Sequence, residues 1–151
     1  MKTITIIQPW ATLIALEEKK FETRSWPTKH RGPLAIHAGK KIDRDVCQQE
    51  PFKSILAKHG YTADNLPTGS VVAVADLKEC FKVRRDVLGG VVALESDTRK
   101  THFNTLDKEF AFGFYASGRL AWEMTDVQRL PEPIPAKGQQ GLWNWEGVNP
   151  V

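Results

Sequence analysis

Hydrophobic and polar positions at the start of the chain predict a strand followed by a short helix. Residues 2–7 are mostly β-branched, which favours an extended strand. Pro9 suits a first helical turn, because its missing N–H would have no partner there. We expect the helix to end near Glu18. Three apolar residues recur at helical spacing and should face the core: Trp10, Leu13 and Ile14.

An alternation with a period of two follows at residues 21–26 and predicts a second strand. Successive side chains of a strand point to opposite faces, so three of them share one face: Glu22, Arg24 and Trp26. Residues 34–38 predict another strand. On it, His37 lies on the face opposite Leu34 and Ile36.

The middle of the chain predicts one long helix and one buried strand. Residues 43–58 have helical character, with Asp43 as the N-cap and Gly60 as the C-terminal stop. Residues 71–75 are apolar on both faces, which is typical of a central strand covered on both sides.

The second half of the chain has weaker patterns. Residues 91–94 fit a strand or a helix, and residues 96–102 are polar and predict a loop. Residues 120–127 predict a strand, and residues 130–135 are extended because every second residue is proline. A turn at 138–141 leads into a last strand at 142–145, and its Gly-Gln-Gln-Gly sequence lacks the lysine and hydroxyl residue of a phosphate loop.

Many short strands with two sizeable helices predict an α+β fold. We expect one domain over residues 1–151, built as a small, closed or nearly closed β-barrel flanked by helices. A closed barrel has no exposed sheet edge, which suits a chain of this size.

Charge is distributed unevenly along the chain. Between Lys19 and Arg44 there are eight Lys or Arg and two acidic residues, a local charge of +6 in a chain of net charge +3. The remainder is therefore acidic, at −3. Concentrated positive charge favours polyanionic partners, of which nucleic acid is the first candidate.

Other features argue against a metal, a cofactor or a membrane anchor. The two cysteines and four histidines match no zinc spacing, and no Ser-His-Asp or Cys-His arrangement stands out. No run approaches 18 apolar residues, and the first residues do not resemble a signal peptide. We therefore expect a cytoplasmic protein without metal or cofactor.

Two short motifs lie near the N-terminus: Gln-Pro-Trp-Ala at residues 8–11 and Lys19-x-x-Glu22-x-Arg24. They resemble the motifs of the ASCH domain (activating signal cointegrator homology), a family of the PUA-like superfamily. The family pattern is G-x-K-x-x-E-x-R, and here Glu17 stands at the glycine position. The resemblance implies a PUA-like β-barrel whose motif lines a cleft beside the first helix. It also implies that nucleic acid, mainly RNA, is the ligand.

The candidate ligand-binding residues follow from this resemblance and from side-chain chemistry. Arg24 could bind phosphate or a base edge, and Glu22 could hold Arg24 or accept a hydrogen bond from a base; a purely structural ion pair is the alternative. Lys19 could contact phosphate or act as a base. The others are a possible stacking platform and nearby polar or basic groups: Trp26, His30, Arg31, His37 and Lys40.

Three functions remain open on the sequence alone. The first is a nucleic-acid-binding module. The second is an enzyme acting on RNA or a modified nucleoside, with Lys19, Glu22 and His37 as candidate acids and bases for metal-free RNA cleavage. Some ASCH relatives instead remove the acetyl group of acetylcytidine, but the threonine they use is replaced here by Glu22. The third is a domain that binds a protein partner.

Overall fold

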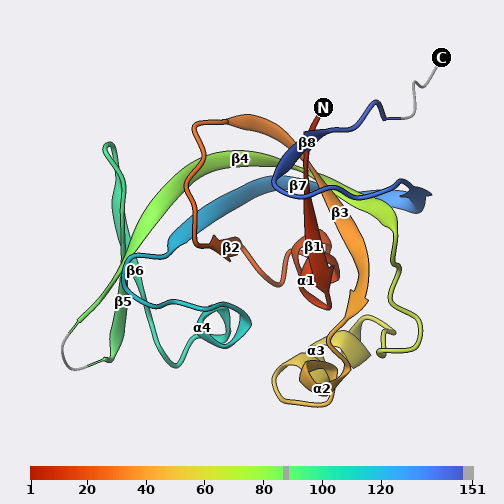
Figure 1. Ribbon diagram of the computed structural model, residues 1–151. Helices are drawn as coiled ribbons and strands as arrows, with labels where there is room; N and C mark the ends of the chain where they lie inside the picture. The colour runs from red at the N-terminus through yellow and green to blue at the C-terminus, as the bar shows by residue number, and fades with distance from the viewer. Residues whose placement is uncertain (87–88, 148–151) are drawn as a thin grey trace.

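The computed structural model describes residues 1–86 and 89–147. Within these residues the chain forms mostly strands with a few short helices, which confirms the predicted α+β class (Figure 1). The strands are β1 (Lys2–Gln8), β2 (Phe21–Arg24), β3 (Gly32–Ile42), β4 (Ser70–Arg85), β5 (Val91–Glu95), β6 (Lys100–Asn104), β7 (Leu120–Pro135) and β8 (Leu142–Asn144). The helices are α1 (Trp10–Ala15), α2 (Arg44–Cys47), α3 (Phe52–Lys58) and α4 (Lys108–Phe112).

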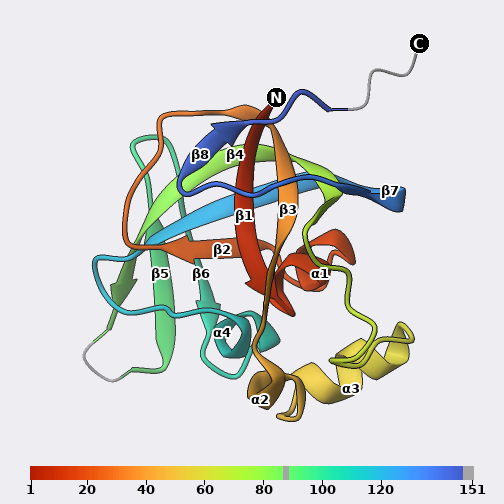
Figure 2. The same ribbon diagram turned by 45° about the vertical axis from the view of Figure 1, so that its right-hand side comes forward.

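The strands form one curved, mostly antiparallel sheet. Its order is β2-β7-β4-β3-β1-β8, and only β1 and β3 run parallel. β5 pairs with the far end of β4, and β6 pairs with β5. Figure 2 shows the long strands β4 and β7 arching over α1. Register shifts between these two strands at three places accompany the curvature, as expected for β-bulges.

The sheet is not closed into a barrel by strand pairing within the described residues. The strand order ends at β2 on one side and at β8 on the other, and no ladder joins them. The predicted PUA-like barrel is therefore not confirmed. A side chain spans part of the gap instead, because Arg24 of β2 donates a hydrogen bond to the carbonyl oxygen of Thr5 in β1.

The core lies on the concave side of this sheet, against α1. Leu13 and Ile14 of the helix are fully buried, as predicted. The predicted central strand is also confirmed, since Val71, Val72 and Ala73 of β4 are buried between β3 and β7. Trp10 also packs against the core, as predicted, although it is only half-buried.

The single helix predicted at residues 43–58 is wrong, because the structure has two short helices there. Asp43 caps α2 as expected, accepting a hydrogen bond from the Val46 N–H at 3.1 Å. α2 ends at Cys47, and Pro51 is the N-cap of α3. A continuous helix through this point is disfavoured, since proline disfavours a helical conformation at the residue before it. α3 then stops before Gly60, whose φ of 83° fits the predicted C-terminal stop.

Other elements of the second half differ from the sequence prediction. The predicted loop at residues 96–102 is wrong at its end, because β6 begins at Lys100. Residues 91–94 form the strand β5 rather than a helix, and α4 was not predicted. In the part of the chain that the structure describes, no helix has the length and apolar character to cross a bilayer.

The turn after α1 contains a residue in an unusual backbone conformation. α1 ends at Ala15, somewhat before the predicted end near Glu18. Glu17 then adopts a φ of 60°, the left-handed region that glycine occupies without strain. Since Glu17 stands at the motif's glycine position, the chain keeps the glycine-type turn with a less suitable residue.

We therefore expect Glu17→Gly to raise the free energy of unfolding by roughly 0.5 to 1 kcal/mol, the relief of left-handed strain less the added freedom of the unfolded chain. Denaturant titration would measure this. Glu17→Ala is the matched control, because it removes the same charge and keeps the strain. Equal stabilisation by both variants would show that charge, and not backbone conformation, is responsible.

Candidate nucleic-acid interface

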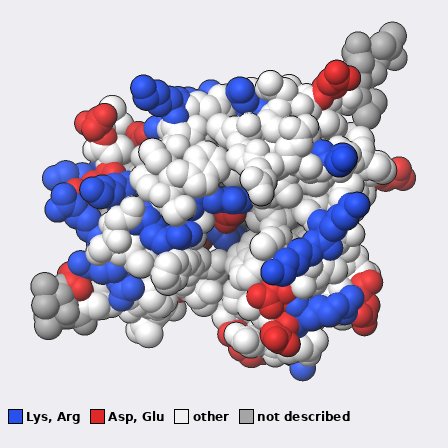
Figure 3. Space-filling model, viewed as in Figure 1, with Lys and Arg blue, Asp and Glu red and all other residues white. Residues whose placement is uncertain are grey.

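A pocket of about 900 Å³ lies between β2, at one end of the sheet, and β1. β1 and α1 form its floor, and β2 with the residues after it forms one wall. The opposite wall comes from the α2–α3 region and the end of α4, and the segment before β8 closes one side. Figure 3 shows a hollow near the centre of this face, with Lys and Arg side chains at and beside it.

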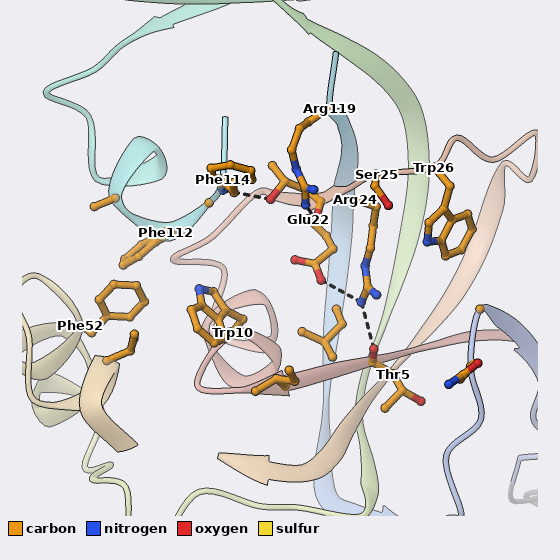
Figure 4. Close-up of a pocket in the computed structure, with 18 of the residues that line it drawn as sticks. Thr5, Trp10, Glu22, Arg24, Ser25, Trp26, Phe52, Phe112, Phe114 and Arg119 are labelled. Atoms are coloured by element: carbon orange, nitrogen blue, oxygen red, sulfur yellow. Dashed lines mark hydrogen bonds and ion pairs between the residues drawn. The ribbon is translucent and has the colours of Figure 1, made fainter. Parts of the chain in front are cut away.

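Arg24 is the motif residue that reaches this pocket with an open donor group. Its Nη2 donates to Glu22 Oε2 at 3.0 Å and to the Thr5 carbonyl oxygen at 2.9 Å (Figure 4). The Glu22 side chain is only 10% exposed, whereas that of Arg24 is 26% exposed. The predicted ion pair therefore exists, and it holds a guanidinium group at the pocket wall.

Lys19 lies behind this wall and is not among the residues that line the pocket. It is 1% exposed, its Nζ donates to the Phe21 carbonyl oxygen, and it lies 3.5 Å from Glu22 Oε1. The Lys19 side chain thus provides a buried counter-charge for Glu22. In this arrangement it has no access to a ligand in the pocket.

A second buried carboxyl group, Glu109 of α4, lies near Lys19. Burial raises the pKa of Glu109, and the nearby positive charge of Lys19 works in the opposite direction. The Glu109 carboxylate accepts hydrogen bonds from the Lys20 N–H at 2.5 Å and from the Tyr115 hydroxyl at 3.2 Å. Burial also raises the pKa of Tyr115. These contacts connect α4 to the start of β2.

Aromatic side chains supply much of the remaining lining. Phe52 packs edge-on against both Trp10 and Phe112, with ring centroids 6.0 and 5.1 Å apart. Phe114 is 63% exposed. Trp26 lines the opposite side and packs edge-on against Trp122 at 4.8 Å, so part of its surface is used in the core. Its predicted stacking role stays a prediction.

His37 is a buried structural residue and does not line the pocket. Its ring nitrogens lie 3.1 Å from Thr5 Oγ1 and 2.7 Å from the Ala136 carbonyl oxygen. A Cβ atom at Gly138 would lie 2.8 Å from the His37 ring, so glycine is needed for this close approach. His37 therefore positions the segment that carries Gln139 and Gln140 into the pocket.

The remaining predicted residues lie away from the pocket. His30 Nε2 contacts the Pro33 carbonyl oxygen at 2.8 Å, Arg31 pairs with Glu79 at 2.8 Å, and Lys40 is exposed. Burial alone would raise the pKa of Glu79, but hydrogen bonds from the Cys80 N–H, Arg31, Thr98 and Ser96 lower it to about 2.

The basic segment that begins at Lys19 is only partly neutralised by ion pairs. Glu22 partners Lys19 and Arg24, Glu79 partners Arg31, and Asp64 partners Arg44. Four exposed lysines form no ion pair with a described residue: Lys20, Lys29, Lys40 and Lys41. The surface therefore keeps part of the positive charge that the sequence indicates, and exposed lysines carry it.

Sequence reasoning missed several pocket residues. Arg119, the residue before β7, lines the pocket beside Arg24. Phe112 and Phe114 come from a region without a clear pattern, and Gln139 and Gln140 belong to a segment that was predicted to be a simple turn. The alternation on β2 could not find them, because they lie far away along the chain, from residue 112 onward. Among the residues with described structure, no group of three or more His, Cys, Asp or Glu is placed to hold a metal ion.

A cluster of ion pairs around Glu18 holds the helices beside the pocket in place. Glu18, in the turn after α1, contacts Lys58 and His59 at 2.7 Å and Lys108 at 2.5 Å. The hydrogen bond from Lys108, followed by those from Lys58 and His59, lowers the pKa of Glu18 to about 2. This single carboxylate therefore ties the ends of α3 and α4 to the β2 side of the pocket.

Comparisons with known proteins agree with the motif resemblance. The model of the ASCH domain family matches residues 4–150. Human Activating signal cointegrator 1 is 31% identical over 85 residues, and the mouse protein of the same name is 32% identical over 85 residues. The match covers 54% of this chain and about 15% of the length of either relative.

We expect Lys19→Met to lower the free energy of unfolding by about 3 kcal/mol, because it leaves Glu22 buried without its closest buried cation. Chemical denaturation would measure the loss. Lys20→Met is the matched control: Lys20 is the next residue, is exposed, and should tolerate the change with little effect. A stable Lys19→Met protein with altered ligand binding would contradict this structural role.

Stability should also fall in acid because of Glu18. The pKa of Glu18 in the folded protein, about 2, lies below its ordinary value of 4.5. Its contribution to the free energy of unfolding is therefore complete above about pH 5 and is lost as the pH falls toward 2. Glu18→Gln should cost about 1 to 3 kcal/mol at pH 7 and should flatten the acid limb of a melting-temperature profile. An unchanged acid limb would show that other carboxylates dominate it.

Proposed function

This chain belongs to the ASCH domain family, and from that premise we propose that it binds RNA in the pocket around Glu22 and Arg24. The family is associated with RNA binding. The observation that supports the proposal best is the Arg24 guanidinium group, which is held by Glu22 and Thr5 at the wall of an open pocket. A guanidinium group that is already oriented loses little freedom when it binds phosphate or a base edge.

The pocket surface also suits a nucleobase. Within the described residues, four large hydrophobic side chains are exposed, and two of them, Ile7 and Phe114, line this pocket. Trp10 and Trp26 add ring surface on opposite sides. Aromatic surface beside fixed positive charge is typical of sites that bind single-stranded nucleic acid, where bases are free to stack.

Binding is supported better than catalysis. Of the three candidate acids and bases, Glu22 alone lines the pocket, whereas Lys19 is buried and His37 is bonded at both ring nitrogens. A general acid or base must come within hydrogen-bonding reach of the group on which it acts. Cleavage of RNA or of a modified nucleoside would therefore have to rely on groups other than Lys19 and His37.

Fluorescence anisotropy with a labelled single-stranded RNA, measured across a salt series, tests the proposal. We expect binding that weakens steeply with salt, since phosphate contacts release counterions. Arg24→Gln should weaken binding roughly tenfold or more, as expected for a lost charge-assisted hydrogen bond. Melting curves would confirm that the variant is folded.

Arg84→Gln is the matched control for this experiment. Arg84 pairs with Glu95 at 3.1 Å, is 65% exposed and lies outside the pocket lining. The Arg84→Gln substitution removes the same charge from a different surface, so RNA affinity should change little. Equal losses in both variants would mean that binding depends on overall charge. No binding at low salt would overturn the RNA proposal and turn attention to a modified nucleoside or a protein partner.

A further inference from the structure

A second arginine, Arg119, directly precedes β7 and lies at the same wall as Arg24. Arg24 is paired with Leu120 in the β2–β7 ladder. Arg119 directly precedes Leu120, so it lies close to Arg24. Arg119 Nη2 donates to the Thr23 carbonyl oxygen at 3.2 Å, and its guanidinium carbon lies 4.9 Å from the centre of the Phe114 ring. Figure 4 shows both arginine side chains pointing into the pocket from the same side, with Arg24 reaching further in.

Both guanidinium groups keep donors that the protein does not use. Each makes its hydrogen bonds through Nη2, and the Nε of each is buried without a partner in the described part of the chain. The Nη1 atoms form no hydrogen bond with a described residue and are not among the buried unpaired nitrogens, so they are open to solvent. Two fixed cations therefore present free N–H groups to one cavity.

The charge balance of the wall favours an anion. Two guanidinium groups face one carboxylate, Glu22, whose Oε2 is bonded to Arg24 and whose Oε1 faces buried Lys19. Glu22 is thus directed toward cations inside the protein. Planar guanidinium groups bind the oxygens of a phosphate group through two or more parallel N–H donors, which makes phosphate the best-matched anion.

We propose that Arg24 and Arg119 together hold one phosphate group of a nucleotide, with its base against the aromatic side of the pocket. This inference rests on the proposed function, and it adds Arg119 as a binding residue and phosphate as the group that it recognises. The phosphate could belong to a free nucleotide, to a strand end or to the RNA backbone.

Isothermal titration calorimetry with uridine and uridine 5′-monophosphate tests the proposal at low salt. The monophosphate should bind at least tenfold more tightly than uridine, because only it offers an anion to the arginine pair. Arg119→Gln should abolish this preference, and Arg84→Gln should preserve it. Arg119→Lys keeps the charge but loses the planar fork, so it should retain only part of the preference.

Dinucleotides distinguish the sources of the phosphate. UpU contains only a backbone diester, whereas pUpU adds a terminal monoester. Equal affinities for the two would assign the arginine pair to the backbone, and tighter binding of pUpU would assign it to a strand end. Either outcome supports the arginine pair, provided that Arg119→Gln removes the binding.

A second readout locates the contact directly. In an NMR spectrum of the arginine Nε–Hε groups, the signals of Arg24 and Arg119 should shift on addition of the monophosphate, and that of Arg84 should not. Uridine and its monophosphate binding alike, or neither binding, would overturn the inference. RNA binding that is lost in Arg24→Gln but intact in a folded Arg119→Gln variant would overturn it as well, while leaving the proposed function in place.

Discussion

The contact of Arg24 with Glu22 and the Thr5 carbonyl oxygen is the interaction on which the pocket depends. β2 has a ladder on one side only, with β7, and its other side faces the gap in the sheet. A backbone ladder across that gap would close the sheet and remove the pocket. Because a side chain spans it instead, the two strands stay connected and the space between them stays open. The same guanidinium group therefore serves the fold and faces the pocket.

The motif residues around Arg24 form a chain of alternating charges, only part of which reaches solvent. Lys19 and Glu22 are nearly buried, and isolated charges in such places cost several kcal/mol. Each is acceptable because the next charge compensates it: Lys19 lies beside Glu22, and Glu22 binds Arg24. Lys19, which its charge made a candidate ligand contact, is thus a buried partner of Glu22. Through Glu22 it stabilises the orientation of Arg24.

The sequence predicted local features well and long-range ones poorly. The strand alternation at Glu22 and Arg24, the Asp43 cap and the buried β4 segment each depend on neighbours along the chain, and each was found. The positive segment overstated the surface charge, because Glu79 and Asp64, which lie outside it, each pair with one of its arginines. Arg119 and the aromatic wall could not be predicted, since only strand order and packing bring them to the motif. One domain over residues 1–151 and a cytoplasmic location stay predictions.

The size of the pocket limits what it can contribute to polynucleotide binding. At about 900 Å³ it matches sites for single small molecules, so it has room for one nucleotide rather than for a length of strand. The rest of an RNA would lie on the surface, where unpaired lysines such as Lys20 and Lys29 supply charge without sequence preference. Affinity for a long RNA and selectivity for one nucleotide would then come from different parts of the molecule. Salt would weaken the surface contribution first, because exposed charges are screened more effectively than the partly buried arginine at the wall.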